Sequence, residues 1–212
     1  MAVAIGRDVA DVLAGQGVEV AFLALHGRFG EDGVIQGILE MLDIPYTGSR
    51  VLASAMGMNK VVAKQVAAWY DIPTPAFVAF DCEDASLPQA CAAARDQLNF
   101  PVMVNPCDEG SSLGVSKVED PADFEAALLD TCRDFRAVMA GEFGAVAAIP
   151  ASPLHSHRAP TALSVLQLKP KADFYDFHAK YNHGMTDFIV PAELPDSVTG
   201  LSQDRARRVH KA

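Results

Sequence analysis

The pattern that most restricts the fold of this chain lies between residues 18 and 42. An apolar run of strand length, Val-Glu-Val-Ala-Phe-Leu-Ala-Leu at residues 18–25, leads into a polar turn punctuated by glycines. From residue 33 to residue 42 the apolar side chains recur at helical spacing, which predicts an amphipathic helix. A strand that enters a helix through such a turn is how an open α/β sheet forms a site at the carboxyl end of a strand. The stretch therefore predicts an α/β fold with a site at this turn.

The composition excludes two classes of partner. Of the 212 residues, 17 are Lys or Arg and 27 are Asp or Glu, which gives a net charge of −10. Nucleic acids and anionic membranes are bound through positive patches, so we expect neither as a partner. No apolar run approaches the ~20 residues that span a bilayer, and the first residues have no basic segment typical of a signal peptide. We therefore expect a cytoplasmic protein.

The four cysteines, Cys82, Cys91, Cys107 and Cys132, show no spacing typical of a metal site. In a protein without a secretory signal they are interpreted as reduced thiols. A disulfide is the alternative, and no metal ligands are assigned.

The rest of the chain predicts shorter elements. Strand–helix alternation changes to hairpin-plus-helix units near residues 57–59, which indicates a boundary between two lobes. Asn59 is suited to cap the helix that follows it. The expected helices cover residues 51–56, 59–70, 87–98 and 121–132, and another begins at 196; the expected strands cover 18–25, 76–80, 101–105, 115–118, 145–149 and 162–168.

The loop Glu109-Gly-Ser-Ser-Leu-Gly114 joins two of these strands. Its glycines permit backbone shapes that aim successive amides at one point, and its two hydroxyls add donors, so such a loop can cover a triphosphate. A tight hairpin turn without a ligand is the alternative. No helix follows the loop directly and no Gly-Lys-Ser/Thr closes it, which excludes a Walker A loop.

A second polar block, Phe174-Tyr-Asp-Phe-His-Ala-Lys-Tyr181, combines a lysine with aromatic hydroxyls. Lys180 can supply a point charge to a phosphoryl group, and Tyr175 and Tyr181 can donate from their hydroxyls. The alternative is an aromatic cluster that packs under a loop, with the lysine on the surface. Likewise, His26 is either a site residue or a polar group that satisfies its turn.

These blocks together resemble the D-alanine–D-alanine ligases of the ATP-grasp group. The family pattern Glu-Gly-Ser-Ser-hydrophobic-Gly-hydrophobic-Ser-Lys occurs without a break from Glu109 to Lys117. The family's Met-Asp-Lys is similar to Met58-Asn59-Lys60, and its Phe-Tyr-Asp-Tyr-x-x-Lys-Tyr is similar to residues 174–181, with Phe177 in place of a tyrosine. The Leu-His-Gly that contains His26 and the Pro-Tyr-Thr-Gly-Ser at residues 45–49 also fit the family.

The resemblance implies the fold, the reaction and the site. The fold would be ATP-grasp-like α/β, with α+β character in the second lobe: a partial N-terminal lobe with an open parallel sheet (1–58), a central nucleotide-covering lobe (59–143) and the start of a third lobe (144–212). The reaction would join two D-alanines for peptidoglycan synthesis, with ATP and Mg²⁺, in a possible homodimer. The residues implied for ATP are Lys60, Glu109, Gly110, Ser111, Ser112, Gly114, Glu142, Phe174, Tyr175 and Lys180, and those implied for catalysis and D-alanine are His26, Ser111 and Tyr181.

The chain departs from the family pattern at several positions. The lysine of the family's Val-Lys-Pro is Asn105 here, and a glutamate on the central strand is Gln167. A Gly-Gly-x-Ser-x-Glu turn, which would bind the substrate amine, and the Arg-x-Asp and Glu-x-Asn segments that hold magnesium have no counterpart in these residues. We therefore expect this chain to be inactive or impaired alone. The alternatives are a non-catalytic or decayed ligase-derived binding module, and a ligase for another amino or hydroxy acid.

Overall fold

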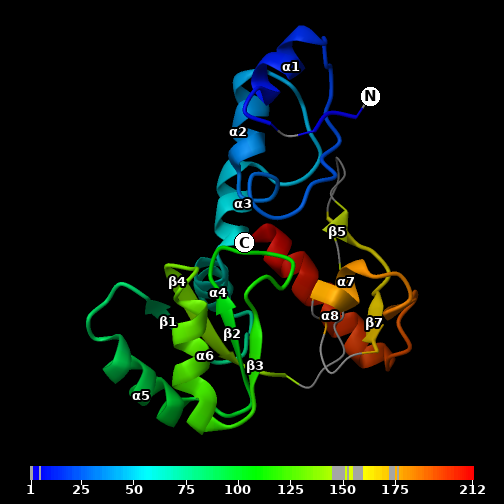
Figure 1. The fold of residues 1–212 in the computed structure, drawn as a ribbon. Coiled ribbons are helices and arrows are strands. Elements are labelled where there is room, and N and C mark those ends of the chain that lie inside the picture. The colour runs from blue at the N-terminus through cyan, green and yellow to red at the C-terminus, as the bar shows by residue number, and fades with distance from the viewer. Residues whose placement is uncertain are drawn as a thin grey trace.

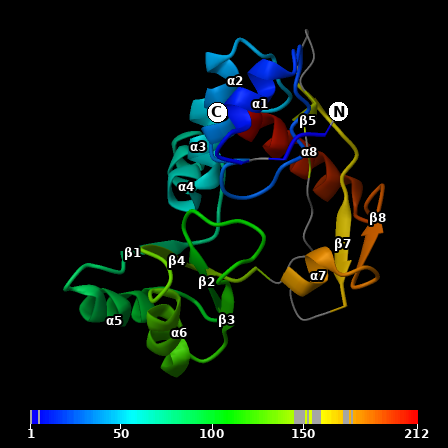
Figure 2. The same ribbon diagram turned by 45° about the horizontal axis from the view of Figure 1, so that its top comes forward.

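The computed structural model describes residues 2–4, 6–144, 151, 153–154, 160–171, 175 and 177–212. Four helices come first along the chain, an antiparallel sheet with two further helices follows, and two short ladders and a long helix complete it (Figure 1, Figure 2). No helix in the described part of the chain is long and apolar enough to cross a membrane.

Three helices precede residue 59, and the first two of them contribute to a small apolar core. They are α1 (Val9–Gly15), α2 (Val34–Met41) and α3 (Val51–Met58). The expected helices over residues 33–42 and 51–56 are confirmed as α2 and α3, whereas α1 was not anticipated from the sequence. The buried members of this core are Val9, Leu13, Ile35, Leu39 and Ile44.

The expected strand over residues 18–25 is wrong as a regular element. Only one residue of this segment, Ala21, forms a β-bridge, in parallel orientation, with Tyr46. The Ala21 amide donates to Pro45 O at 2.8 Å, and the Thr47 amide donates to Ala21 O at 3.1 Å. A strand requires a partner along its whole length, and here the pairing ends after one bridge, which leaves the Phe22 side chain 81% exposed. An apolar run alone therefore did not decide this conformation.

Helix α4 (Lys60–Trp69) begins where the sequence placed it. The Oδ1 atom of Asn59 accepts a hydrogen bond from the Val62 amide at 3.0 Å, which confirms Asn59 as the N-cap.

An antiparallel sheet in the order β1-β4-β2-β3 forms the middle of the chain. Alternate residues of its central strands, Val102 and Val104 in β2 and Val138 and Ala140 in β4, are fully buried with Phe124 and Leu128 of α6. The strands are β1 (Phe77–Asp81), β2 (Val102–Pro106), β3 (Ser116–Val118) and β4 (Ala137–Glu142), and the helices are α5 (Leu87–Gln97), the 3-10 turn η1 (Pro121–Asp123) and α6 (Phe124–Thr131). All except β4 correspond to elements expected from the sequence.

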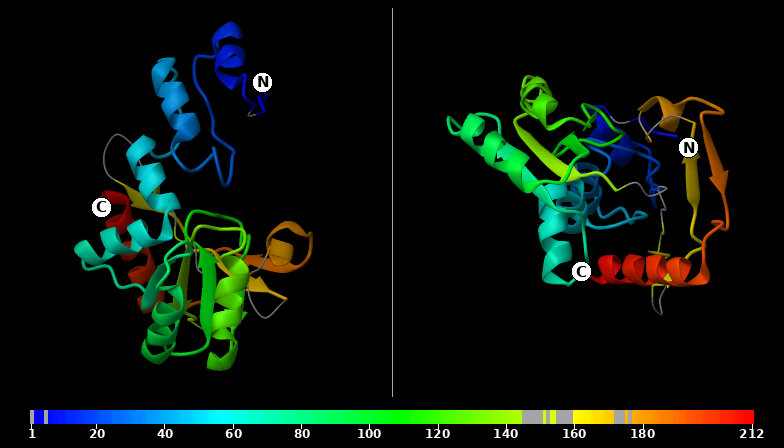
Figure 3. Two further views of the ribbon diagram at one scale, coloured as in Figure 1. Left: turned by 60° about the vertical axis from the view of Figure 1, so that its left-hand side comes forward. Right: turned by 90° about the horizontal axis from the view of Figure 1, so that it is seen from below.

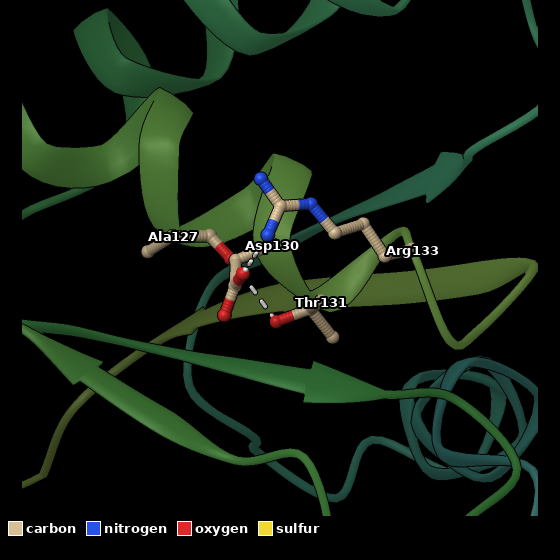
Figure 4. Close-up of polar contacts among 4 residues, drawn as sticks. All are labelled: Ala127, Asp130, Thr131 and Arg133. Carbon is tan, nitrogen blue, oxygen red and sulfur yellow. Dashed lines mark hydrogen bonds and ion pairs between the residues drawn. The ribbon is translucent and has the colours of Figure 1, made fainter.

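The interpretation of all four cysteines as reduced thiols is wrong for two of them. Cys82 and Cys132 form a disulfide with a Cα–Cα distance of 5.4 Å, whereas Cys91 and Cys107 are free and buried. The two half-cystines meet because the Cys82 amide extends the β1–β4 ladder by donating to Arg136 O at 2.8 Å, and Cys132 caps the end of α6 just before β4. Beside it, Thr131 Oγ1 donates to Ala127 O and Arg133 pairs with Asp130, which fixes the last turn of α6 (Figure 4).

The last part of the chain contains two antiparallel ladders and two helices. The expected strand over residues 162–168 is wrong as one element, because Ala162 ends β6 and Gln167 starts β7. The expected strand over 145–149 lies outside the described residues, and the expected C-terminal helix is confirmed as α8. The elements are β5 (Pro153–Leu154), β6 (Thr161–Ala162), β7 (Gln167–Pro170), α7 (Phe177–Tyr181), β8 (Thr186–Ile189) and α8 (Asp196–Lys211).

Candidate active site

The loop between β2 and β3 has a strained and closely packed backbone. Ser111 and Ser112 adopt left-handed conformations, with φ of 55° and 59°, which are uncommon for residues other than glycine. Gly114 has φ of +65°, and a Cβ atom there would lie 2.5 Å from Phe135 Cε2 and 3.0 Å from Pro106 Cγ. Only glycine fits at this end of the loop. Backbone strain of this kind is concentrated at functional sites, because the surrounding structure has to maintain it.

Lys60, the first residue of α4, binds the start of this loop. Its Nζ atom donates to Pro106 O at 2.8 Å and also to Glu109 O, and its amide donates to Cys107 O at 3.0 Å. Burial lowers the pKa of the Lys60 ammonium, while the carboxylates of Asp108 and Glu109 act in the opposite direction. The structure therefore holds a half-buried cation against the loop through two carbonyl groups.

Lys180, from α7, faces the same region. Burial lowers the pKa of Lys180 too, and the positive charge of Lys180 is a smaller contribution to the lowered pKa of Lys60. The Lys180 Nζ atom lies 5.4 Å from the ring centroid of Tyr175. Among the described residues, neither lysine forms an ion pair. Two neighbouring cations that form no ion pair within the described part of the chain are suited to bind an anion such as a phosphate.

The three residues expected at the catalytic position lie together. Ser111 Oγ and Tyr181 Oη share a hydrogen bond of 2.5 Å although the two residues are 70 positions apart, and the His26 and Tyr181 ring centroids are separated by 6.1 Å. Ser112 Oγ donates to Tyr175 O at 3.2 Å. The loop, the helix α7 and the turn after residue 25 therefore meet at one place.

A cavity of about 520 Å³ adjoins this meeting point and is lined by residues that include Lys60, Glu109 and Gly110. Two further polar residues in its lining were not anticipated. Glu31 Oε2 accepts from the Gly27 amide at 2.6 Å, which fixes the turn next to His26. Gln36 is only 4% exposed; its Nε2 donates to Gly30 O at 2.9 Å, and its Oε1 has no partner within the described part of the structure. The apolar run, the glycine-punctuated turn and the helix after it predicted a site here, but did not indicate Glu31 or Gln36 as members of it.

Other residues expected at the nucleotide are not brought to this group. Glu142 is paired with Val102, at the end of the sheet opposite to Pro106, and four residues of strand span about 13 Å. Its carboxylate accepts from the Asn99 amide at 3.0 Å and from Asn99 Nδ2 at 2.6 Å. Phe174 lies outside the described residues. Asn105, which replaces the lysine of the family pattern and was not expected to bind the nucleotide, donates to Met103 O at 3.1 Å.

The described residues contain no group of three or more His, Cys, Asp or Glu side chains arranged to hold a metal ion. Mg²⁺ is commonly held by one or two carboxylates together with the phosphates of a substrate, so this finding assigns no metal role to the described residues.

Comparison with known proteins agrees with this geometry. The family profile described as "D-ala D-ala ligase C-terminus" matches residues 66–212, and "D-ala D-ala ligase N-terminus" matches residues 6–49. The chain belongs to the D-alanine–D-alanine ligase family. This is a family of ATP-dependent ligases that use ATP and Mg²⁺.

Its relatives are longer than this chain. The D-alanine–D-alanine ligase of Syntrophotalea carbinolica is 42% identical over 207 residues, which are 98% of this chain and 64% of that protein. The enzyme of the same name from Geotalea uraniireducens is 42% identical over 92% of this chain and 60% of its own length. The chain thus spans somewhat less than two thirds of these relatives.

Solved structures show the same fold. The VanG D-Ala:D-Ser ligase of Enterococcus faecalis has a TM-score of 0.79 at 26% identity, over 92% of this chain and 56% of that one. The D-alanine–D-alanine ligase of Bacillus anthracis has a TM-score of 0.74 at 29% identity, over 99% of this chain and 66% of that one. The ATP-grasp ligase fold expected from the sequence is confirmed, with antiparallel sheets in a mixed α/β chain.

Proposed function

We propose that this chain forms the phosphate- and substrate-holding part of a D-alanine–D-alanine ligase. The observation that carries the proposal is the hydrogen bond between Ser111 and Tyr181, made beside two lysines that form no ion pair among the described residues. A covering loop, two cations and a pair of hydroxyls in one region of the structure are what a reaction between a triphosphate and an amino acid requires.

In the proposed reaction, the carboxylate of one D-alanine takes the γ-phosphoryl group of ATP, and ADP leaves. The amine of a second D-alanine then attacks the acyl phosphate, which releases phosphate and forms D-alanyl-D-alanine. Lys60 and Lys180 would offset the negative charge of the phosphates, and the amides and hydroxyls of residues 109–114 would cover them. Ser111 and Tyr181, with His26 beside them, would orient the first D-alanine.

We also propose three lobes at residues 1–58, 59–143 and 144–212, a cytoplasmic location and a homodimer.

Turnover by this chain alone would be impaired. Asn105 stands where the family pattern has a lysine, and its side-chain amide donates to Met103 O. The described residues contain no group of three or more His, Cys, Asp or Glu side chains arranged to hold a metal ion. Restoring lysine with Asn105→Lys alone is then expected to leave turnover unrestored.

The similarity to a D-Ala:D-Ser ligase supports a second candidate, a ligase that takes another amino acid as its second substrate.

Two measurements on the purified 212-residue chain test the proposal. Calorimetric titration with ATP is expected to show binding that Lys60→Met abolishes. Phosphate release with ATP, Mg²⁺ and D-alanine, against controls without D-alanine and with D-serine added, measures turnover and its specificity. An absence of ATP binding by the unmodified chain would refute the proposed function. Binding that is unchanged in Lys60→Met would refute the role of that lysine.

A further inference from the structure

Two adjacent residues at the start of α4, Asn59 and Lys60, donate hydrogen bonds to residues 106–109, where the loop between β2 and β3 begins. Lys60 donates from its amide to Cys107 O and from its ammonium to Pro106 O and Glu109 O. Asn59 Nδ2 donates to Asp108 Oδ1. Every residue from 106 to 109 therefore accepts a hydrogen bond from residue 59 or 60, so the position of the Lys60 ammonium and the path of the loop are set together.

Asn59 makes two bonds that require an amide side chain. Its Oδ1 accepts from the Val62 amide at 3.0 Å, which caps α4, while its Nδ2 binds Asp108. Aspartate at position 59 would keep the cap but has no proton to donate when ionised. It would also bring a second carboxylate to hydrogen-bonding distance of the Asp108 carboxylate, where like charges repel.

We infer that Asn59 and Asp108 are a matched positioning pair that places the Lys60 ammonium against the loop. The inference rests on the proposed function of Lys60 as a phosphate-binding residue. The negative charge of Asp108 also opposes the lowering of the Lys60 pKa by burial, so holding Asp108 in place favours the charged lysine. Aspartate at position 59, as in the family's Met-Asp-Lys, would therefore fit this chain only if residue 108 changed with it.

A double-mutant cycle tests the pairing. Asn59→Asp is expected to raise the Kd for ATP about tenfold, the loss typical of one hydrogen bond to a charged group. Adding Asp108→Asn reverses the donor and the acceptor, and is expected to return the Kd to within about threefold of the unmodified chain, since neither charge repulsion nor an unpaired carboxylate remains. Asp108→Asn alone keeps an acceptor for Asn59 but removes the negative charge that favours the Lys60 ammonium, so an increase in Kd smaller than that of Asn59→Asp is expected.

Two control variants separate the effect of losing the Asn59 amide from the effect of adding a negative charge. Asn59→Ser keeps a side chain that caps helices but replaces the Nδ2 amide with a shorter hydroxyl and adds no charge, so an increase smaller than that of Asn59→Asp is expected. Gln97→Glu adds the same charge at an exposed position of α5, and no change is expected.

Hydrogen exchange of the Lys60 amide provides a readout that needs no ATP. Because this amide donates to Cys107 O, Asn59→Asp is expected to speed its exchange and the reversed pair to slow it again. Equal Kd and exchange rates in Asn59→Asp and in the double variant, or no effect of Asn59→Asp, would overturn the inference. A chain that binds no ATP but shows rescue of exchange would refute the proposed function and leave the positioning pair established.

Discussion

Gly114→Ala is expected to lower the free energy of unfolding by about 2–5 kcal/mol. The first contribution is the left-handed conformation at φ of +65°, which costs a residue with a Cβ atom about 1–2 kcal/mol. The second is the overlap of the new Cβ with Phe135 at 2.5 Å and with Pro106 at 3.0 Å, and overpacking of this kind costs about 1–3 kcal/mol. Pro106 is the last residue of β2 and Phe135 lies just before β4, so the overlap affects residues at the ends of the two central strands of the sheet.

Gly184→Ala is the matched control for this substitution. Gly184 also has a positive φ, of +80°, but no atom lies within 4 Å of the Cβ position, so only the conformational contribution of about 1–2 kcal/mol is expected. Urea unfolding followed by circular dichroism measures both losses. Phe135→Leu removes ring atoms from the overlap and is expected to reduce the loss caused by Gly114→Ala. Equal losses in the two alanine variants, with no relief by Phe135→Leu, would refute the packing argument.

Three further predictions concern the cysteines and the hydroxyl pair. Reduction of Cys82–Cys132, which closes a 50-residue separation, is expected to lower the free energy of unfolding by about 4 kcal/mol in urea titrations, whereas Cys82→Ser should make the protein insensitive to reductant. Burial raises the pKa of Cys107 to about 11 from 9.0, so the stability linked to this thiol is present below pH 9 and is lost as the pH rises towards 11. Cys107→Ala should therefore flatten the pH dependence of urea unfolding in that window, and an unchanged slope would contradict the assignment. Tyr181→Phe and Ser111→Ala each break the hydrogen bond between these residues, and each is expected to weaken D-alanine binding, measured by calorimetry in the presence of ATP, by about fivefold to tenfold, with no further loss in the double variant.

The sequence predicted elements whose stability depends on local signals. Helices α2 and α4 have apolar residues at helical spacing, and α4 also has a capping side chain directly before it. Residues 18–25 have an equally clear apolar pattern, but a strand depends on a partner, and only Ala21 has one. The pairing of Cys82 with Cys132 depends on the register of β1 against β4, and β4, with its alanines and glycine, did not look like a strand.

In the candidate site too, the sequence predicted the features that depend on local residues and missed those that depend on the fold. The loop Glu109–Gly114 was found from its own residues, whereas its contact with Tyr181 was anticipated only through the family resemblance, because 70 residues separate the two hydroxyls. Glu31 and Gln36 were missed, since their significance comes from the cavity that the turn, α2 and α3 form around them. Residue types can indicate which chemistry is possible, but the fold decides which groups meet.

Helix α4 links the loop to the last helix of the chain. At its first residue, Lys60 is bound to residues 106–109, and just beyond its last residue the carbonyls of Tyr70 and Asp71 accept from Arg208 Nη2 of α8 at 2.6 Å and 3.1 Å. Figure 3 shows the C-terminal end of α8 beside the end of α4. Carbonyls at a helix C-terminus favour a cation, so Arg208 binds where the charge of α4 is most negative. A shift of α8 would thus move a rigid helix whose other end carries the ammonium group of the proposed phosphate site. Residues 106–109 and Arg208 of α8 therefore hold the two ends of the helix that carries Lys60, although only the loop residues and Lys180 share its proposed ligand.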